Sequence, residues 1–565
     1  MKKKLVTYGL IIIVAIIAIL ALRIVLTRRA TQVYINGKVL TMDPGNSIAE
    51  AVAVRDGRIV AVGTNEQVRQ SAPGRTATFD LHGKTMMPGI IDAHGHFPGT
   101  GIYAFGVDLN SPPIGRITDI PQMIQALKEK AAATDSGEWI LGLGYDDTLL
   151  PEKRHPTRHD LDQASTNHPI FILHISGHMG VVNSLALQKA GITSKTPSPE
   201  GAVIRKDPLT GEPTGVFEEC ALEIFMPLLD FSTLDTLRIV RRAVQDHLRA
   251  GMTTAQDGLA DEKRVKNLKL ASRLGFIPLR VIVWPDEELG MKIVRREFDP
   301  RKYDSEKFHI GAVKLIEDGS TQAYTSYLKE PYYTPFNGDA SYSGYPRIER
   351  EKLAEKVMTL HRAGLQIAVH CNGDAAIENF IYAFGRAQKE YYRRDPRAII
   401  VHAQLIRPEQ LDAAKELGMT PTYHLIHPYY WGDRHWEIFL GPERASRICP
   451  AKSTLDRAIT FSTHLDAPVV PLQPMLLAWC AVNRLSKEGR VVGPDERISP
   501  MQALRAMTID AAWQVFQEKN IGSIEPGKYA DIIVLSADPL GDPLNIRNIV
   551  VEKTIIGGKT VYERE

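Results

Sequence analysis

Cysteine is scarce in this chain, and neither sign of charge dominates. Its 565 residues include four cysteines, Cys220, Cys371, Cys449 and Cys480, which are too few and too scattered for a disulfide framework or a cysteine-rich zinc site. The 68 Lys and Arg residues nearly balance the 66 Asp and Glu residues, and the resulting net charge of +2 provides no electrostatic footprint for nucleic acid. We therefore expect neither a disulfide scaffold nor a nucleic-acid partner.

The overall composition is that of a globular protein. Hydrophobic residues make up 44% of the chain and charged residues 24%, which excludes a wholly disordered chain and a polytopic membrane protein. A typical domain has ~100–150 residues, so the length excludes a single small module. A (β/α)₈ barrel alone takes roughly 250 residues, and one barrel with additions would fit this chain.

One apolar run departs from these averages. Lys2–Lys4 precede Leu5–Leu22, an uninterrupted stretch of apolar or near-neutral residues that ends at Arg23. At ~1.5 Å per residue this run nearly crosses a ~30 Å hydrocarbon core. We interpret residues 1–29 as an uncleaved single-pass membrane anchor, with the catalytic part exported to the periplasm or the cell exterior. The alternatives are a cleaved signal peptide, which lacks a small-x-small cleavage site here, and a buried soluble helix, which lacks a polar face.

Both ends of the remaining chain are rich in short β segments. Pairs of apolar segments flank Asn36-Gly37, Asp56-Gly57 and Gly557-Gly558, and each dipeptide is typical of a two-residue β-hairpin. We expect residues 30–86 and 520–565 to form one small composite β-sandwich domain.

The centre of the chain alternates buried strands with helical stretches. The helical segment Glu351–Ala363 is followed by the short apolar segment Gln366–His370, and the same order recurs further along. This alternation is typical of parallel βαβ units, so we predict an α/β fold with a (β/α)₈ TIM-like barrel over residues 87–519. Residues at about 98–219 are less regular and rich in Pro and Gly, and we predict an insertion there that contributes to the pocket wall.

The strongest chemical signal is His94-Gly95-His96 at the end of the apolar segment that follows Pro88. Residues two apart on a strand point to the same face, so both imidazoles could bind one metal ion. Such a pair alone is weak evidence for a metal site, because His-x-His in a buried strand often has a structural role.

Further polar residues occur at or near the ends of later apolar segments, at barrel-like spacing: Lys314, His370, His402 and Asp466. The separation 402 − 370 = 32 residues corresponds to one βα unit, and 466 − 402 = 64 corresponds to two. Barrel enzymes place their active sites at the carboxyl ends of the strands. Taken together with His94 and His96, these residues predict a metal centre.

At this point the chain resembles the amidohydrolase superfamily, and specifically its branch of N-substituted formamide deformylases and related amide hydrolases. The resemblance covers nearly everything after the apolar run. It is carried by the segments Pro88–His96, Ser176–His178, Gly215–Glu218, Val313–Gly319, Val369–His370, Val401–His402, Asp466–Pro468 and Gly522–Val534.

The resemblance implies a role for each candidate ligand. His94, His96 and Asp466 would hold the more buried divalent metal ion, and His370 and His402 a second one. Lys314, carboxylated by carbon dioxide, would bridge the two ions. If Lys314 is instead unmodified and paired with Glu317 or Asp318, one ion remains. Nitrogen and oxygen ligands without a thiolate suit zinc, although manganese, iron and nickel also fit.

The activity implied is hydrolysis of a C–N bond in an amide, an N-substituted formamide or a cyclic amide. A metal-activated hydroxide would attack the carbonyl, and Asp466 would pass the proton to the leaving nitrogen. Two alternatives stay open: hydrolysis of an ester, lactone or phosphoester at the same centre, and a catalytically inactive membrane-tethered binding protein. We expect a small amide-like substrate, and count a homodimer among the assemblies open to the chain.

Residues outside the ligand set are further candidates. His178 matches a family position near the substrate, and Tyr423 and His424 end the predicted seventh strand and lead into an aromatic-rich loop, 427–436. We predict that His178, Tyr423 and His424 contact the substrate. Leu465 departs from the family, which often has Ser or Thr directly before the aspartate. His464 lies one residue further back, and we expect it to be a hydrogen-bonded supporting residue.

Overall fold

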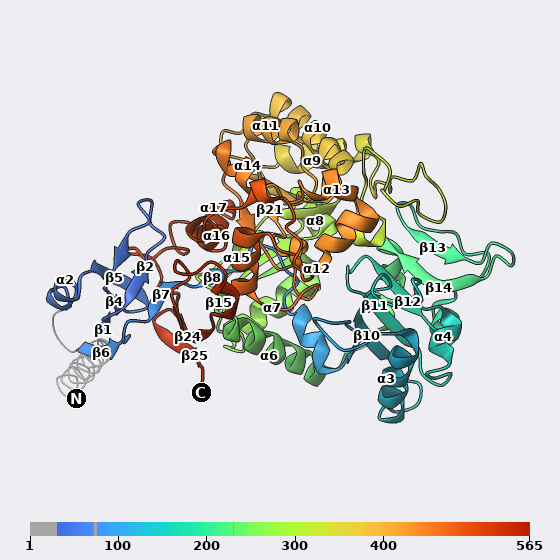
Figure 1. Cartoon of the computed structure of the whole chain (residues 1–565), viewed down its shortest axis with the longest axis horizontal. Coiled ribbons are helices and arrows are strands. Elements are labelled where there is room, and N and C mark those ends of the chain that lie inside the picture. Colours follow the sequence, from blue (N-terminus) through green and yellow to red (C-terminus); the bar gives the residue numbers. More distant parts are fainter. Residues whose placement is uncertain (1–30, 73–75, 230) are drawn as a thin grey trace, which may run out of the picture. The chain divides into compact units, whose positions relative to one another are not determined.

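The computed structural model describes residues 31–72, 76–229 and 231–565. The predicted anchor at 1–29 lies outside these residues, and no helix within them is both long and apolar enough to cross a membrane. The described chain divides into two compact units (Figure 1). One combines the region up to Gly89 with Lys519–Asp538 and Val550–Glu565, and the other comprises Ile90–Glu518 with Pro539–Ile549.

The first unit draws its strands from both ends of the chain, as the sequence predicts. Among the described residues it has a four-stranded sheet in the order β5-β4-β1-β6 and a six-stranded sheet in the order β25-β24-β23-β7-β2-β3. One apolar cluster joins the two, with Tyr34 and Val52 from the first sheet and Met86 and Ile532 from the second. The elements are β1 (Thr31–Ile35), β2 (Lys38–Leu40), β3 (Ile48–Ala49), β4 (Ala51–Arg55), β5 (Arg58–Gly63), α2 (Asn65–Gln70), β6 (Thr76–Asp80), β7 (Thr85–Pro88), β23 (Ile532–Leu535), β24 (Val551–Ile556) and β25 (Lys559–Glu563).

Two of the three predicted hairpins in this unit are confirmed. β4 pairs antiparallel with β5 around Asp56-Gly57, and β24 with β25 around Gly557-Gly558. The hairpin predicted at Asn36-Gly37 is wrong, because β1 pairs with β4 and β6 while β2 lies in the other sheet. Both edges of β1 are therefore filled, and the turn carries the chain from one sheet to the other.

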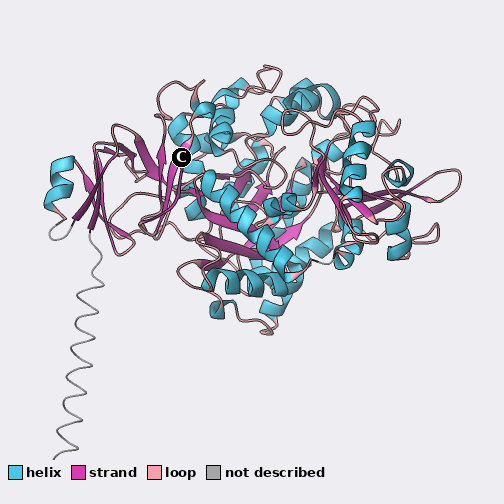
Figure 2. Cartoon of the chain, turned by 90° about the horizontal axis from the view of Figure 1, so that it is seen from below, coloured by secondary structure: helices cyan, strands magenta, loops and turns pink. Residues whose placement is uncertain are grey.

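The second unit contains a barrel of parallel strands, and in Figure 2 helices enclose these strands. Hydrogen bonds join them into two sheets, β17-β16-β15-β8 and β18-β19-β20-β21-β22. The backbone bonds from His96 N to Ala467 O and from Asp466 N to His94 O connect the chain beyond β8 to the chain beyond β22, which closes the barrel on one side. The strands are β8 (Ile90–Ile91), β15 (Met252–Ala260), β16 (Arg280–Pro285), β17 (Phe308–Ile310), β18 (Val313–Ile316), β19 (Ile367–Cys371), β20 (Ala398–His402), β21 (Met419–Tyr423) and β22 (Ser462–Thr463).

β17 and β18 act as one strand interrupted at Gly311. β17 pairs with β16, and β18 pairs with β19. A Cβ atom at Gly311 would lie 2.8 Å from Trp284 Cδ1, so only glycine lets the backbone pass this buried ring. With the two counted together, the described chain has the eight strand positions of a (β/α)₈ barrel, in agreement with the predicted α/β class.

The helices follow the strands and cover the outside of the barrel. In α10, Ala376, Phe380, Ala383 and Phe384 are buried, and their spacing of three and four residues places them on one face. The helical elements of this layer are α6 (Thr233–Arg249), α7 (Glu262–Arg273), α8 (Glu287–Val294), α9 (Arg350–Arg362), α10 (Asp374–Glu390), α11 (Pro408–Leu417), α12 (His427–Arg434), η6 (His435–Phe439), α13 (Gly441–Ala445), α14 (Ala451–Asp456), α15 (Pro474–Asn483), α16 (Pro500–Ala506) and α17 (Ile509–Gln514).

A separate sheet is inserted between β8 and β15. Its described strands run in the order β13-β14-β12-β11-β10-β9, and neighbouring residues such as Ile140 and Leu141 belong to different apolar clusters, one on each face. The elements are η1 (Gly99–Ala104), β9 (Val107–Asp108), α3 (Ile120–Ala132), β10 (Ile140–Tyr145), α4 (Arg158–Asp162), β11 (Ile170–His174), β12 (Met179–Val182), α5 (Ser184–Ala190), β13 (Val203–Lys206), β14 (Pro213–Glu218) and η2 (Glu219–Ile224).

Candidate metal centre

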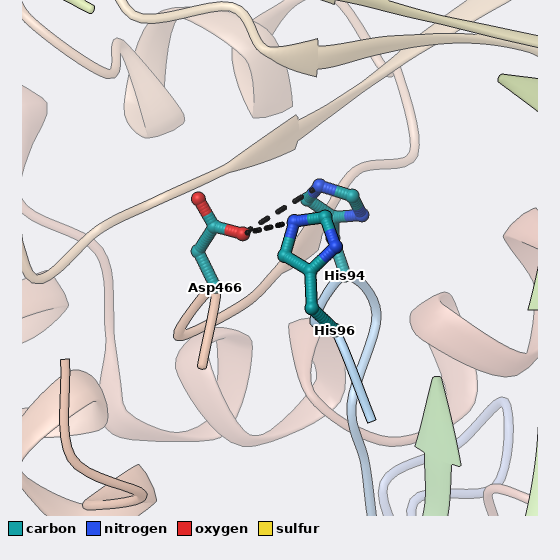
Figure 3. Close-up of side chains that lie close together, drawn as sticks. All are labelled: His94, His96 and Asp466. Atoms are coloured by element: carbon teal, nitrogen blue, oxygen red, sulfur yellow. Dashed lines mark ion pairs between the residues drawn. The ribbon is translucent and has the colours of Figure 1, made fainter. Parts of the chain in front are cut away.

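The structure brings together His94, His96 and Asp466 at the carboxyl ends of barrel strands (Figure 3). One potential ligand atom from each lies within 4.8 Å of the others. Asp466 Oδ1 is 3.6 Å from His94 Nε2 and 3.4 Å from His96 Nε2. Both imidazoles point toward the same carboxylate (Figure 3).

His370, His402 and Lys314 border this group. The rings of His370 and His402 are 4.5 Å apart, and the His402 ring is 5.5 Å from that of His94. His402 Nε2 lies 3.9 Å from Asp466 Oδ2, and Lys314 Nζ lies 3.2 Å from His94 Nε2. All six residues predicted as ligands therefore gather in one place.

The strand register shows how two of these side chains reach the site. Ala368 pairs with Ile399, both belong to one buried cluster with Trp284, and His370 lies on the same face of β19 as Ala368. His402 follows Val401, a member of that cluster, so regular alternation would turn it outward. Its φ of +68° breaks the alternation, and Asp466 has a φ of +54°. Non-glycine residues are strained in this region of φ, and such strain is concentrated at functional sites.

Each of three histidines is held through Nδ1 by a buried neighbour. His94 Nδ1 is 3.2 Å from Gln256 Oε1, and His370 Nδ1 is 3.1 Å from Asp318 Oδ1. His402 Nδ1 is 3.0 Å from His464 Nε2, which confirms the supporting role predicted for His464. Contacts of this kind orient the ring and leave Nε2 as the potential ligand atom, although Asn372 Nδ2 lies 3.4 Å from that atom of His370.

Asp318 is itself firmly held. The described residues donate five hydrogen bonds to its carboxylate: Asn372 N and His370 Nδ1 to Oδ1, and Gly373 N, Tyr327 N and Ser326 Oγ to Oδ2. Burial raises the pKa of Asp318 to about 7, against the effect of these hydrogen bonds. The carboxylate thus links the end of β19 to the chain that follows β18.

The electrostatics favour unprotonated nitrogen ligands beside an ionised carboxylate. Burial lowers the pKa values of His94, His370 and His402 well below the usual value. Burial alone would raise the pKa of Asp466, but the neighbouring histidines outweigh it and hold that pKa well below its usual range. Burial also lowers the pKa of Lys314 to about 7, although Asp466 opposes this shift. Uncharged imidazole and amine groups are the forms that bind metal ions or carbon dioxide.

The residues fit a divalent metal ion. Asp466 Oδ1 is buried and accepts no hydrogen bond from the described residues, although two imidazole nitrogens lie within 3.6 Å. Lys314 is 2% exposed and, among the described residues, forms no ion pair with Glu317 or Asp318, contrary to the proposed alternative for an unmodified lysine. Apart from the 3.2 Å contact of Lys314 Nζ with His94 Nε2, these lone-pair donors do not hydrogen-bond to one another, and such a gathering is what a cation site requires.

The three residues predicted to contact the substrate are placed differently. The ring of His178 is 4.8 Å from that of His370, and the ring of His424 stacks on His464 at 5.3 Å. Tyr423 is not brought to the site: it is fully buried, and its hydroxyl is 2.7 Å from Thr454 Oγ1 in α14. The register explains this, because Tyr423 pairs with His402, a position that regular alternation along the strand turns outward.

The aromatic segment after His424 is helical and not the predicted loop. α12 begins at His427, and Pro428 lies in its first turn, where backbone N–H groups have no acceptor within the helix, so the N–H that proline lacks costs no hydrogen bond. The π-helical turn η6 follows. Trp431 is buried there, with its ring 4.7 Å from that of His427. This helix therefore packs over the histidines beyond β21.

A second group of possible ligands, Asp146, Asp147 and His174, lies at the ends of β10 and β11. Arg434 Nη1 contacts Asp146 Oδ2 at 2.5 Å. The backbone N–H of Ser176 donates to His174 Nδ1, so in the neutral imidazole the proton lies on Nε2, 3.2 Å from Asp147 Oδ1. Arg434 balances the charge of Asp146, whereas His174 Nε2 is buried without a hydrogen-bond partner among the described residues; because Asp146 is already paired, we assign no metal ion to this group.

Comparisons with known proteins agree with this geometry. A sequence profile described as the amidohydrolase family matches residues 77–562. The chain is 28% identical over 551 residues to an N-substituted formamide deformylase of Arthrobacter pascens, and the alignment covers 95% of this chain and 99% of that protein. It is 29% identical over 543 residues to protein LONG AFTER FAR-RED 3 of Arabidopsis thaliana, with 93% and 91% covered.

Two crystal structures of uncharacterized metal-dependent hydrolases are similar in fold. The one from Pyrococcus horikoshii gives a TM-score of 0.73 at 25% identity and covers 91% of this chain and 99% of its own. The one from Pyrococcus furiosus gives a TM-score of 0.69 at 26% identity, with 90% and 100% covered. With the profile matching most of the chain and the histidines and Asp466 gathered at the barrel mouth, this chain belongs to the amidohydrolase family.

Proposed function

We propose that the chain is a metal-dependent hydrolase that cleaves the C–N bond of an amide, an N-substituted formamide or a cyclic amide. The observation that carries this proposal is the convergence of His94, His96, His370, His402 and Lys314 on the Asp466 carboxylate. The similarity to a formamide deformylase over 95% of the chain supports the choice of bond.

His94, His96 and Asp466 would hold one divalent metal ion, and His370 and His402 a second one, with carboxylated Lys314 between them. Zinc suits these ligands. A metal ion bound there would supply an acidified water molecule and polarise a carbonyl oxygen.

The protein's own groups then act on protons and orientation. Asp466 stays ionised because its pKa is held low, so it can accept a proton from the attacking water and deliver it to the leaving nitrogen. Its side chain is 13% exposed, and that of His96 is 35% exposed, which leaves both within reach of a substrate. Gln256, Asp318 and His464 keep the three imidazoles oriented throughout.

Metal analysis and a substrate panel test this proposal. The purified protein should contain one or two equivalents of divalent metal, lose activity to a chelator and regain it with Zn²⁺. It should hydrolyse amides or formamides in a panel that also contains esters, lactones and phosphoesters. Turnover of the other classes alone would replace the amide assignment, and absence of both metal and turnover would favour the non-catalytic binding protein.

Asp466→Asn tests the proton transfer separately. We expect kcat to fall at least about 100-fold, the lower range for a general acid–base group, with the folded state retained. The matched control is Asp495→Asn, a change at an exposed position in a short turn, which should leave kcat unchanged. Full activity in Asp466→Asn would remove Asp466 from the proton transfer.

The membrane anchor at 1–29 and export of the catalytic part remain part of the proposal. Fractionation of cells that express the full chain, before and after deletion of residues 1–29, would test both.

A further inference from the structure

We propose that His178 contacts the substrate beside His370 and accepts a hydrogen bond from the N–H of the amide that is cleaved, and that Glu219 is the positioning residue that orients it. The inference rests on the proposed amide hydrolysis. It narrows the substrate class to amides that carry an N–H, as formamides of primary amines do.

At the edge of the metal centre, His178 has one hydrogen-bond partner for its ring among the described residues. It lies in the turn between β11 and β12, and its ring is 4.8 Å from the ring of His370. Its Nδ1 is 2.8 Å from Glu219 Oε2, and its side chain is 16% exposed. The imidazole is thus neither a buried core residue nor a free surface group.

Glu219 is buried against residues of two other segments, and its Oε1 has no hydrogen-bond partner among the described residues. The side chain is fully buried, and Arg347 Nη1 lies 3.7 Å from Oε2, the oxygen that His178 Nδ1 also contacts. A Cβ atom at position 319 would lie 2.0 Å from Glu219 Oε1, so Gly319 leaves room that a larger residue would fill. Glu219 therefore connects the inserted sheet with the segment that follows β18 and with the segment that precedes α9.

The backbone of Glu219 is also in an uncommon conformation. Its φ is +55°, and its N–H donates to the carbonyl of His178 at 2.8 Å. A non-glycine residue stays at such a φ only where its surroundings fix it. Burial disfavours ionisation of the carboxyl, but His178 and Arg347 outweigh that effect and lower its pKa. The carboxylate is thus an ionised acceptor aimed at one nitrogen of one imidazole.

The contact between Glu219 and His178 Nδ1 determines whether His178 Nε2 donates or accepts a hydrogen bond. A carboxylate has no proton to donate, so the proton between Glu219 and His178 lies on Nδ1. In the neutral imidazole Nε2 is then an acceptor, and no described residue donates to it. An N–H beside the scissile carbonyl would satisfy it. Esters and N,N-disubstituted amides offer no such donor, and sites built around one hydrogen bond discriminate against analogues that lack it.

The test compares formanilide with N-methylformanilide and phenyl formate. In His178→Ala we expect kcat/KM for formanilide to fall about tenfold, the effect of a hydrogen bond worth about 1.4 kcal/mol. The values for the two probes without an N–H should change less than about twofold, since they cannot form that bond. His159→Ala, an exposed histidine of the same inserted region, is the matched control and should alter none of the three.

Variants of Glu219 test the positioning role. Glu219→Gln keeps an oxygen that can accept from Nδ1, so it should retain most of the preference for formanilide. Glu219→Ala should lose that preference as His178→Ala does. If Glu219→Ala does not fold, Glu219→Gln and His178→Ala still decide the question, because a merely structural role would lower all three kcat/KM values together.

The outcomes separate this inference from the proposed function. If the wild-type protein hydrolyses formanilide and His178→Ala lowers all three values equally, the contact to the N–H is refuted while amide hydrolysis stands. If the wild-type protein hydrolyses phenyl formate but no amide of the panel, the proposed function fails and the inference fails with it.

Discussion

Asp318→Asn is the substitution for which the structure predicts the sharpest effect. The described residues direct two donors at Oδ1, including His370 Nδ1, and three at Oδ2. An asparagine has one acceptor oxygen and one NH₂ group, so in either orientation the NH₂ group faces at least two donors. Those two donors would then be buried without an acceptor.

The magnitude follows from this count. A buried donor without a partner costs about 1–3 kcal/mol, so two cost roughly 2–6 kcal/mol of unfolding free energy. The loss of the carboxylate behind His370 should also weaken metal binding or activity about 10–100-fold, as is usual when a partner of a ligand histidine is removed.

The assay separates these two effects. Urea unfolding of the chelator-treated proteins measures stability without a contribution from bound metal, and metal titration followed by kinetics measures the site. Asp495→Asn is again the control, with an expected change within about 0.5 kcal/mol. A change in Asp318→Asn as small as that of the control, with metal affinity unaltered, would refute the argument from the two donors.

Two further substitutions test the supporting structure. Gly319→Ala places a methyl group 2.0 Å from both Glu219 Oε1 and Thr325 Oγ1, so we expect the free energy of unfolding in urea to fall by about 1–3 kcal/mol and kcat to fall as well. The control is Gly45→Ala, which should be nearly neutral because its new Cβ would meet nothing closer than 3.5 Å. Arg484 is fully buried and donates to the carbonyls of Ile448, Cys449 and Val492. Arg484→Met should therefore lower the free energy of unfolding by at least about 3 kcal/mol in the same assay. A decrease below about 1 kcal/mol would contradict the importance of those hydrogen bonds.

The positions of the candidate ligands along the chain could be predicted because parallel strands end at the same mouth of a barrel. The period of two along a strand also places His370 correctly from the sequence. The same rule misplaces His402, which would face outward without its φ of +68°, and it shows why Tyr423 does not reach the site. The pattern of hydrophobic residues along the sequence does not predict a positive φ at a single residue.

The residues that orient the ligands were harder to find. Gln256 is 162 residues from His94, and Glu219 is 41 residues from His178. These contacts depend on how separate elements pack, which a single sequence does not reveal. No sequence pattern marked Gln256 or Glu219: Gln256 follows Met252-Thr-Thr-Ala255, which is not an apolar run, and lies within β15.

The failed hairpin at Asn36-Gly37 has a similar origin. The dipeptide does form a turn, with a φ of +56° at Asn36. Local turn chemistry specifies that the chain reverses or bends, but not which strand lies beside which. In this unit β4 and β6 occupy the two edges of β1, and β2 pairs with β7 in the other sheet.

The order β25-β24-β23-β7-β2-β3 has a consequence for synthesis on the ribosome. β7 ends at Pro88 and its partner β23 begins at Ile532, so 532 − 88 = 444 positions separate the two strands. At ~5–20 residues per second, this interval takes roughly 20–90 s to translate. Throughout it, the apolar strand β7 has one edge without its native partner, and such edges recruit other chains. The nascent protein is therefore most exposed to misassembly while its catalytic barrel is being made.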